Sequence, residues 1–143
     1  MKTKTTPAIS PVMQQVSRYI AAAPKKALPK AVLEKTKHHV LDTIAAMVSG
    51  SRLLPGEKAI SYIKTLGGAK EATVIGSRFV TTAINAALAN GMLAHADETD
   101  DSHPLALMHP GCAIVPAALA MGERVRASGT ALLRAVALGY DVA

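Results

Sequence analysis

One short segment of this chain gathers most of the side chains that could carry out chemistry. Six ionisable groups stand between residues 97 and 109, namely Asp97, Glu98, Asp100, Asp101, His103 and His109. Crowded carboxylates disfavour one another's charge, so one of them can act as a proton donor near neutral pH. Histidine is the commonest partner for proton transfer. The segment therefore predicts general acid–base chemistry, such as removing a proton next to a carboxylate and expelling hydroxide.

Two other interpretations of the same segment stay open at this point. Aspartate, glutamate and histidine are also ligands for zinc or iron. Their spacing matches no known metal motif, because a calcium loop starting at Asp97 would place Ser102 and Met108 where glycine and glutamate are required. We therefore expect no metal. The carboxylates could instead cap helix ends from a solvated loop, although Leu105 and Leu107 should tie the loop down.

The elements that must hold this segment are predicted to be helices. Apolar residues at helical spacing predict six of them, at about residues 11–22, 29–49, 55–66, 81–94, 113–121 and from 128 onward. Gly50 is expected to end the second helix in a left-handed conformation, and Pro116 to lie in the first turn of the fifth. Residues 72–75 form one short extended run. The fold class is all-α, with no sheet of three or more strands.

Caps and apolar faces refine this prediction. Thr81 or Thr82 and Ser128 are expected to cap helices. Residues 1–10 are expected to be disordered, so that the domain covers residues 11–143. The predicted inward positions are Leu33, Thr36, Val40, Ile44, Met47 and Val48, then Ala59, Ile60 and Ile63, then Ile84, Ala87, Leu88 and Met92, and finally Leu132, Ala135, Val136 and Tyr140.

Composition and charge narrow the function class. The net charge is +6, and residues 1–40 hold eight Lys and Arg against Glu34 alone. A nucleic-acid interface would combine a basic stripe with aromatic residues, and the chain has only four aromatic side chains. Cys112 is the single cysteine, which fits a reducing compartment. No apolar run approaches the roughly 18–20 residues that span a bilayer. We expect a cytoplasmic protein without nucleic-acid or membrane partners.

Several short runs, taken in order, resemble the signature of the MmgE/PrpD family. They are LDTIAAMVSG (41–50), ATVIG (72–76), NGMLAH (90–95), DETDDSH (97–103), HPG (109–111) and GYD (139–141). The family includes 2-methylcitrate dehydratases, cis-aconitate decarboxylases and an iminodisuccinate epimerase. The resemblance implies a helical domain, a smaller lid domain, a homodimer, a small polycarboxylic acid as substrate, and catalysis without a metal or organic cofactor.

The resemblance also assigns roles to individual residues. The family's Asp-Phe-Asp-Asp-Thr element falls on residues 98–102, so that Glu98 stands for its active-site aspartate and Ser102 for its threonine. The His-Pro histidine falls on His109. These positions imply Glu98 and His109 as catalytic residues and Ser102 as a substrate-binding residue, and we predict in addition that Asp101 is catalytic and that His103 binds substrate. Glu98 is one methylene longer than aspartate, which leaves the substrate open, and the family's further catalytic histidine, lysines and tyrosine correspond to positions beyond 143.

The sequence thus predicts part of the N-terminal domain of a lyase, without the lid. The alternative is a catalytically inactive remnant, or an assembly subunit that packs against a partner chain, because the last helix has no stop signal. We expect the chain alone to self-associate through Leu132, Ala135, Val136 and Tyr140. We also expect little activity from it, because the loop offers four carboxylates and no cation, and the nearest basic residues in sequence are Arg78 and Arg124.

Overall fold

The computed structural model describes residues 9–143, and within them the chain forms six α-helices. Residues 1–8, which belong to the segment expected to be disordered, lie outside the described part. The helices are α1 (Pro11–Ala22), α2 (Lys30–Gly50), α3 (Leu54–Leu66), α4 (Ala83–His95), α5 (Pro110–Val125) and α6 (Gly129–Val142), with a 3-10 turn, η1 (Ala23–Lys25), after α1. The strands β1 (Ala72–Thr73) and β2 (Val80–Thr81) complete the fold, and the all-α class is confirmed.

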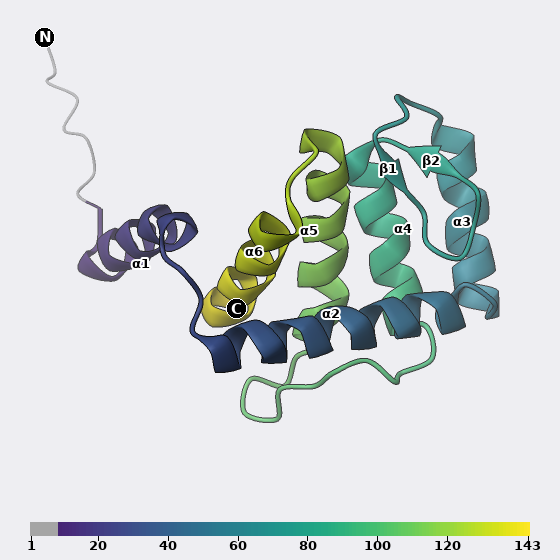
Figure 1. Cartoon of the computed structure of the whole chain (residues 1–143). Helices are drawn as coiled ribbons and strands as arrows, with labels where there is room; N and C mark the ends of the chain where they lie inside the picture. Colours follow the sequence, from purple (N-terminus) through teal and green to yellow (C-terminus); the bar gives the residue numbers. More distant parts are fainter. Residues whose placement is uncertain (1–8) are drawn as a thin grey trace, which may run out of the picture.

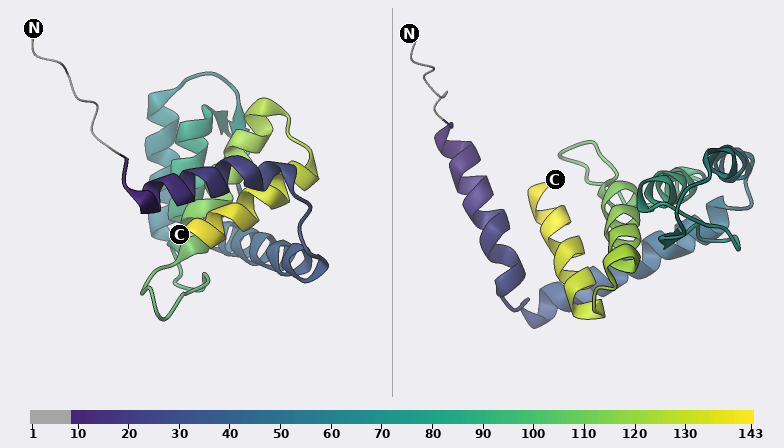
Figure 2. Two further views of the ribbon diagram at one scale, coloured as in Figure 1. Left: turned by 90° about the vertical axis from the view of Figure 1, so that its left-hand side faces the viewer. Right: turned by 90° about the horizontal axis from the view of Figure 1, so that it is seen from above.

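Helix α4 lies at the centre of the packing. It contacts α2, α3 and α5, and α6 packs on the far side of α5 (Figure 1). Helix α2 runs across one end of the other helices, and the loop between α4 and α5 lies next to α2 at that end (Figure 1). Helix α1 has no buried residue and stands at the margin of the fold (Figure 2). The crossing of α2 over the end of α4 and the start of α5 is what positions the acidic loop.

The centre of the fold is packed with small side chains. The buried residues of α4 are Ala83, Ala86, Ala89, Asn90, Leu93 and Ala94. The inward face predicted for this helix was therefore wrong, because Ile84, Leu88 and Met92 are exposed. The helices around α4 approach it closely, so alanine fills four of its six buried positions, whereas Ile84, Leu88 and Met92 face outward. The inward positions predicted for α3, by contrast, are buried or half-buried.

The extended run predicted at residues 72–75 has a partner. Strand β1 pairs antiparallel with β2, with Ala72 opposite Thr81 and Thr73 opposite Val80. The buried side chain of Asn90 holds this hairpin to α4, since its Oδ1 accepts from Ile75 N at 2.9 Å and its Nδ2 donates to Thr73 O at 3.0 Å. Two-residue strands are too short to show the alternation that identifies a strand in sequence, so the second one was missed.

Most predicted helix ends are confirmed. Thr82 and Ser128 accept hydrogen bonds from the backbone of their own first turns. Gly50 differs, because it is the last residue of α2, and the C-cap residue that follows it, Ser51, is in the right-handed conformation. A Cβ at Gly50 would lie 1.9 Å from Leu93 O, so this glycine permits the close crossing of α2 and α4. Pro116 also differs, because α5 begins at Pro110 and contains Pro116 in its interior.

Helix α6 is covered better than the sequence suggested. Val136 is fully buried, and Leu132 and Tyr140 pack against the core. Only Ala135 of the predicted apolar face is exposed. Self-association through this face is therefore not supported. In the part of the chain that the structure describes, no helix has both the length and the apolar character needed to cross a membrane.

Candidate active site

The acidic loop connects two helices that lie side by side. His95 is the last residue of α4, and His109 immediately precedes α5. Because α4 and α5 are packed neighbours, the two histidines are brought together although thirteen residues separate them in the sequence. The loop turns back at Glu98, which adopts a left-handed conformation with φ of 57°. The next carboxylate, Asp100, thereby enters the space between the helix ends.

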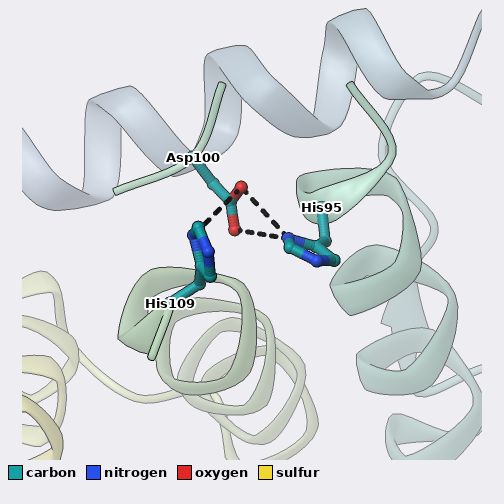
Figure 3. A group of neighbouring side chains, drawn as sticks. All are labelled: His95, Asp100 and His109. Carbon is teal, nitrogen blue, oxygen red and sulfur yellow. Dashed lines mark hydrogen bonds and ion pairs between the residues drawn. The ribbon is translucent and has the colours of Figure 1, made fainter. Parts of the chain in front are cut away.

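Asp100 lies between the two histidines (Figure 3). His95 Nδ1 is 3.2 Å and 3.1 Å from the two carboxylate oxygens of Asp100. His109 Nδ1 lies 3.6 Å from Asp100 Oδ1, and the rings of His95 and His109 are 4.9 Å apart between centroids. The side chain of Asp100 is only 1% exposed, whereas those of His95 and His109 are 44% and 36% exposed. A buried carboxylate is thus shared by two imidazoles that reach solvent.

Asp101 serves a different set of partners. Its Oδ1 accepts from Gly111 N at 2.8 Å, at the start of α5, and its Oδ2 accepts from the Tyr140 hydroxyl at 2.6 Å. His39 of α2 stacks on Tyr140 and places Nδ1 3.5 Å from Asp101 Oδ2. Negative charge at a helix N-terminus is favourable, which stabilises Asp101 at the start of α5. Through Tyr140 and His39, Asp101 also connects the loop to α6 and α2.

Two weak acids beside this pair of aspartates are held in their neutral forms. Burial, and then the negative charge and hydrogen bonding of Asp100, raise the pKa of Cys112 to about 11. Burial, and then the hydrogen bond to Asp101, raise the pKa of Tyr140 well above its ordinary value. Cys112 and Tyr140 therefore remain hydrogen-bond donors near neutral pH, and neither is a ready nucleophile or base.

A hollow of about 550 Å³ opens beside Asp101. Its lining comes from α2 and the loop, and consists of Lys35, His38, His39, Leu41, Asp42, Ala45 and Asp101. The sequence argument found no cation near the acidic loop, because it considered only residues close in sequence. Helix α2 brings Lys35 and two histidines to the loop in space. Such groups can offset the repulsion between these carboxylates and an anionic ligand.

The residues predicted for the site fall into two groups. His109 belongs to the cluster with Asp100, and Asp101 lies in the network beside it. Glu98 is 76% exposed and approaches His95 Nε2 with its Oε1 at 3.8 Å. Ser102 and His103 are exposed on the outer part of the loop. His103 Nδ1 accepts a hydrogen bond from Ala106 N at 3.1 Å, so the neutral ring carries its proton on Nε2.

Sequence reasoning missed His95, Asp100, His39 and Tyr140 as members of the site. His95 and Tyr140 stood in the runs that carried the family resemblance, and Asp100 was among the six ionisable groups. The missing signal was direction, because spacing within a loop does not show which side chains turn inward. His39 lies fifty-six residues before His95, and only the crossing of α2 reveals its contribution.

The cluster also has the composition of a metal site. One ligand atom from each of His95, Asp100 and His109 lies within 4.8 Å of the others. Two histidines and one carboxylate are ligands that zinc and iron accept. The spacing argument against a metal considered consecutive residues only and does not apply to this folded arrangement. The absence of a metal therefore stays a prediction, to be tested by binding.

The geometry defines a helical domain that brings a shared carboxylate and two histidines together at the junction of two helices. The family model for the MmgE/PrpD N-terminal domain matches residues 14–143, so the chain belongs to the MmgE/PrpD family. The resemblance read from the sequence is confirmed.

Curated relatives point to the same family. The chain is 28% identical over 137 residues to the cis-aconitate decarboxylase-like protein oryM of Aspergillus oryzae, a match that covers 91% of this chain and 28% of that protein. It is 30% identical over 102 residues to the cis-aconitate decarboxylase of Aspergillus terreus, covering 71% of this chain and 21% of that protein. The matched region thus spans 28% of the first relative and 21% of the second.

Proposed function

We propose that this domain supplies acid–base groups to a lyase that acts on small polycarboxylic acids. The reaction would be dehydration of a 2-methylcitrate-like substrate or decarboxylation of a cis-aconitate-like one. Membership of the MmgE/PrpD family and the similarity to cis-aconitate decarboxylases support the class of reaction. The single observation that carries the proposal is the meeting of His95, Asp100 and His109 at one accessible point of the fold.

In this proposal His109 transfers the proton. In a dehydration, a base takes the proton from the carbon next to a carboxylate, a double bond forms, and an acid gives a proton to the departing hydroxyl, which leaves as water. In a decarboxylation, carbon dioxide leaves and an acid protonates the carbon left behind. His109 and Glu98 are the pair proposed for these roles, since both reach solvent beside His95. General acid–base catalysis contributes about 10²–10⁴-fold in rate.

Substrate carboxylates are proposed to bind on the loop and in the neighbouring hollow. The Ser102 hydroxyl and the Nε2–H of His103 are exposed donors, and Lys35 and His38 line the hollow beside Asp101. Asp101 is retained as a proposed member of the site. Both of its oxygens already accept hydrogen bonds from Gly111 and Tyr140. Its contribution would therefore be to hold the loop, and proton transfer would fall to Glu98 and His109.

The whole protein is proposed to be cytoplasmic and homo-oligomeric, with no organic cofactor and no metal. The curated relatives are several times longer than the matched region. Further anion-binding groups are therefore expected from other parts of a family enzyme, and this domain alone should act slowly.

The test is an assay with cis-aconitate and 2-methylcitrate, comparing the protein with His109→Asn. Turnover that falls by about 10² or more in the variant supports a role in proton transfer. Glu57→Gln serves as the control, because Glu57 is an exposed residue in the first turn of α3. Turnover that survives His109→Asn unchanged contradicts the proposal.

A non-catalytic assembly subunit is the second candidate, and one observation favours it. The apolar side chains of Ile84, Leu88 and Met92 are exposed along α4. A subunit of this kind would neither turn over the two acids nor bind them at the loop. Absence of turnover, together with unchanged nuclear magnetic resonance signals of His95 and His109 when cis-aconitate is added, would favour this candidate.

A further inference from the structure

We infer that Asp100 is a positioning residue that holds His95 and His109 with their protons on Nδ1, leaving Nε2 of His109 as the atom that exchanges a proton with the substrate. The inference rests on the proposed function for the substrate. Its structural content, the tautomer of two histidines, stands on the geometry alone. Neither the sequence resemblance nor the comparisons assign a role to Asp100 or His95.

The first support is the direction of the two rings. Both histidines present Nδ1 to the same carboxylate, His95 at 3.1 Å and His109 at 3.6 Å (Figure 3). His109 Nδ1 is buried, and among residues 9–143 no group lies within hydrogen-bond distance of it. Asp100 Oδ1 is an acceptor only slightly beyond that distance. A small rotation of the exposed ring would complete the bond, as the hydrogen bonds of catalytic groups often tighten when substrate binds.

The second support is the burial of Asp100. An ionised carboxylate removed from water needs donors to offset its desolvation. His95 supplies one donor on Nδ1 and His109 is placed to supply another. The thiol of Cys112 lies close enough for Asp100 to raise its pKa. A carboxylate accepts at both oxygens, so it can fix two imidazoles in the same tautomer at once.

The third support is the set of charges around the cluster. Glu98 Oε1 approaches the opposite nitrogen of His95, Nε2, at 3.8 Å. The neighbouring carboxylate, Asp101, accepts hydrogen bonds from Gly111 N and the Tyr140 hydroxyl. The carboxylate that faces both histidines is therefore Asp100. His95 thus stands between two carboxylates, whereas His109 faces only Asp100 among the ion pairs of the described residues. His109 therefore has the freer Nε2 of the pair.

The arrangement explains why aspartate stands at position 100. An asparagine has the same shape but offers one acceptor and one donor. It could accept from one Nδ1–H but would face the other ring with its NH₂ group. At least one histidine would then turn its ring over or move its proton to Nε2. Fixing a tautomer through the other ring nitrogen is a common way of setting which atom reacts.

The first experiment uses the unaltered protein. Nitrogen-15 nuclear magnetic resonance of the imidazoles, after chelator treatment, distinguishes a protonated from an unprotonated ring nitrogen in each neutral histidine. We expect Nδ1–H for both His95 and His109, and Nε2–H for His103, whose Nδ1 accepts from Ala106. A neutral His109 that carries its proton on Nε2 would overturn the inference, and this result requires no variant to fold.

The second experiment compares Asp100→Asn with Glu57→Gln. The Asp100 variant should change the tautomer of at least one of the two histidines, while His103 stays as it was. Glu57→Gln should change none of them. Unchanged tautomers in a folded Asp100→Asn protein would contradict the inference. With a turned-over polycarboxylate, kcat should fall in Asp100→Asn by up to about 10²–10⁴-fold, the usual contribution of general acid–base catalysis, with little change in KM.

Zinc provides the decisive contrast. If the chelated protein takes up one zinc ion and the Nδ1 signals of His95 and His109 shift together, the cluster is a metal site and the inference fails. If the tautomers are as expected but no polycarboxylate is turned over, the proposed function fails and the positioning role of Asp100 stands.

Discussion

At the scale of single residues, two adjacent aspartates have separate partners. Asp100 faces His95 and His109, whereas Asp101 faces Gly111, Tyr140 and His39. Neighbouring side chains in an extended loop point in different directions, so one short run can serve both a reactive cluster and the anchor that holds it. A substitution at either aspartate should consequently produce a different defect, and the residues around each aspartate allow the two to be measured separately.

Cys112 reports on Asp100. Burial and the charge of Asp100 raise the pKa of this thiol to about 11, and the thiolate is the form that reacts with alkylating agents. At pH 8 or below, alkylation of Cys112 should be roughly a hundredfold slower, or more, than alkylation of an ordinary thiol with a pKa of about 8.5. The neutral Cys112 thiol contributes to the free energy of unfolding. This contribution is complete below the ordinary thiol pKa and is lost as pH rises toward 11.

The measurement is the rate of iodoacetamide alkylation as a function of pH, with the reduced peptide as reference. Asp100→Asn should lower the pKa of Cys112 and speed its alkylation. A midpoint near that of the peptide in the native protein would show that the thiol is not held beside a buried carboxylate.

Tyr140→Phe removes the hydroxyl that donates to Asp101 at 2.6 Å. Because the acceptor is a charged and largely buried carboxylate, the free energy of unfolding should fall by about 1–3 kcal/mol. Tyr62→Phe is the matched control, since Tyr62 is exposed on α3, and should stay within about 0.5 kcal/mol. Urea denaturation measures both, and equal losses in the two variants would argue against the Asp101 anchor.

The sequence predicted the reactive segment but not the arrangement inside it. The residue types between 97 and 109, and the resemblance of the surrounding runs, sufficed to locate it. Which carboxylate turns inward depends on the backbone at Glu98, whose positive φ is unusual for a residue other than glycine. Composition carries no signal of such a turn. His39 depends on a helix crossing, which one sequence without tertiary information does not reveal.

At the scale of helices, bounds were easier to predict than faces. Proline, glycine and capping residues act locally, so the ends at Ala22, Leu66, Thr82 and Ser128 could be predicted within a residue or two. The face of α4 could not, because the usual assumption that large apolar residues point inward fails in a crowded centre. There the distance between helices decides, and four of the six buried residues of α4 are alanines.

Gly50→Ala tests this account of the helix crossing. The added Cβ would lie 1.9 Å from Leu93 O, and a backbone carbonyl inside α4 cannot move aside easily. The free energy of unfolding should fall by about 1–3 kcal/mol or more. In Gly129→Ala the new Cβ meets no atom within 4 Å, and stability should stay equal or rise by up to about 1 kcal/mol, because alanine favours helix.

Thermal unfolding followed by circular dichroism distinguishes the two glycine variants. A Gly50→Ala protein as stable as Gly129→Ala would mean that α2 and α4 do not cross as closely as described. Both spectra should remain dominated by helix.

At the scale of the whole molecule, the uneven charge of the chain acquires a structural meaning. Helix α2 carries Lys30, Lys35 and Lys37 from the basic first part of the sequence. It crosses the helix ends that hold the acidic loop (Figure 1). Lys35 thereby reaches the hollow beside Asp101. Charges that are separated along the chain are thus partly balanced in the fold.

Self-association remains a prediction, but through a different surface from the one the sequence suggested. Ile84, Leu88 and Met92 lie four residues apart along α4 and are 77%, 50% and 44% exposed. Single exposed apolar residues are normal, whereas three along one helix face form a continuous strip of the kind that marks interaction surfaces. We expect light scattering to give a mass above 14.8 kDa, the mass of one chain.

Leu88→Glu should reduce association by placing a charge in the middle of the strip. Leu54→Glu is the control, because Leu54 is also exposed, at 66%, and lies at the start of α3. It should leave the mass unchanged. A monomer at every concentration tested would contradict the prediction, and an equal effect of both substitutions would show that α4 is not the surface involved.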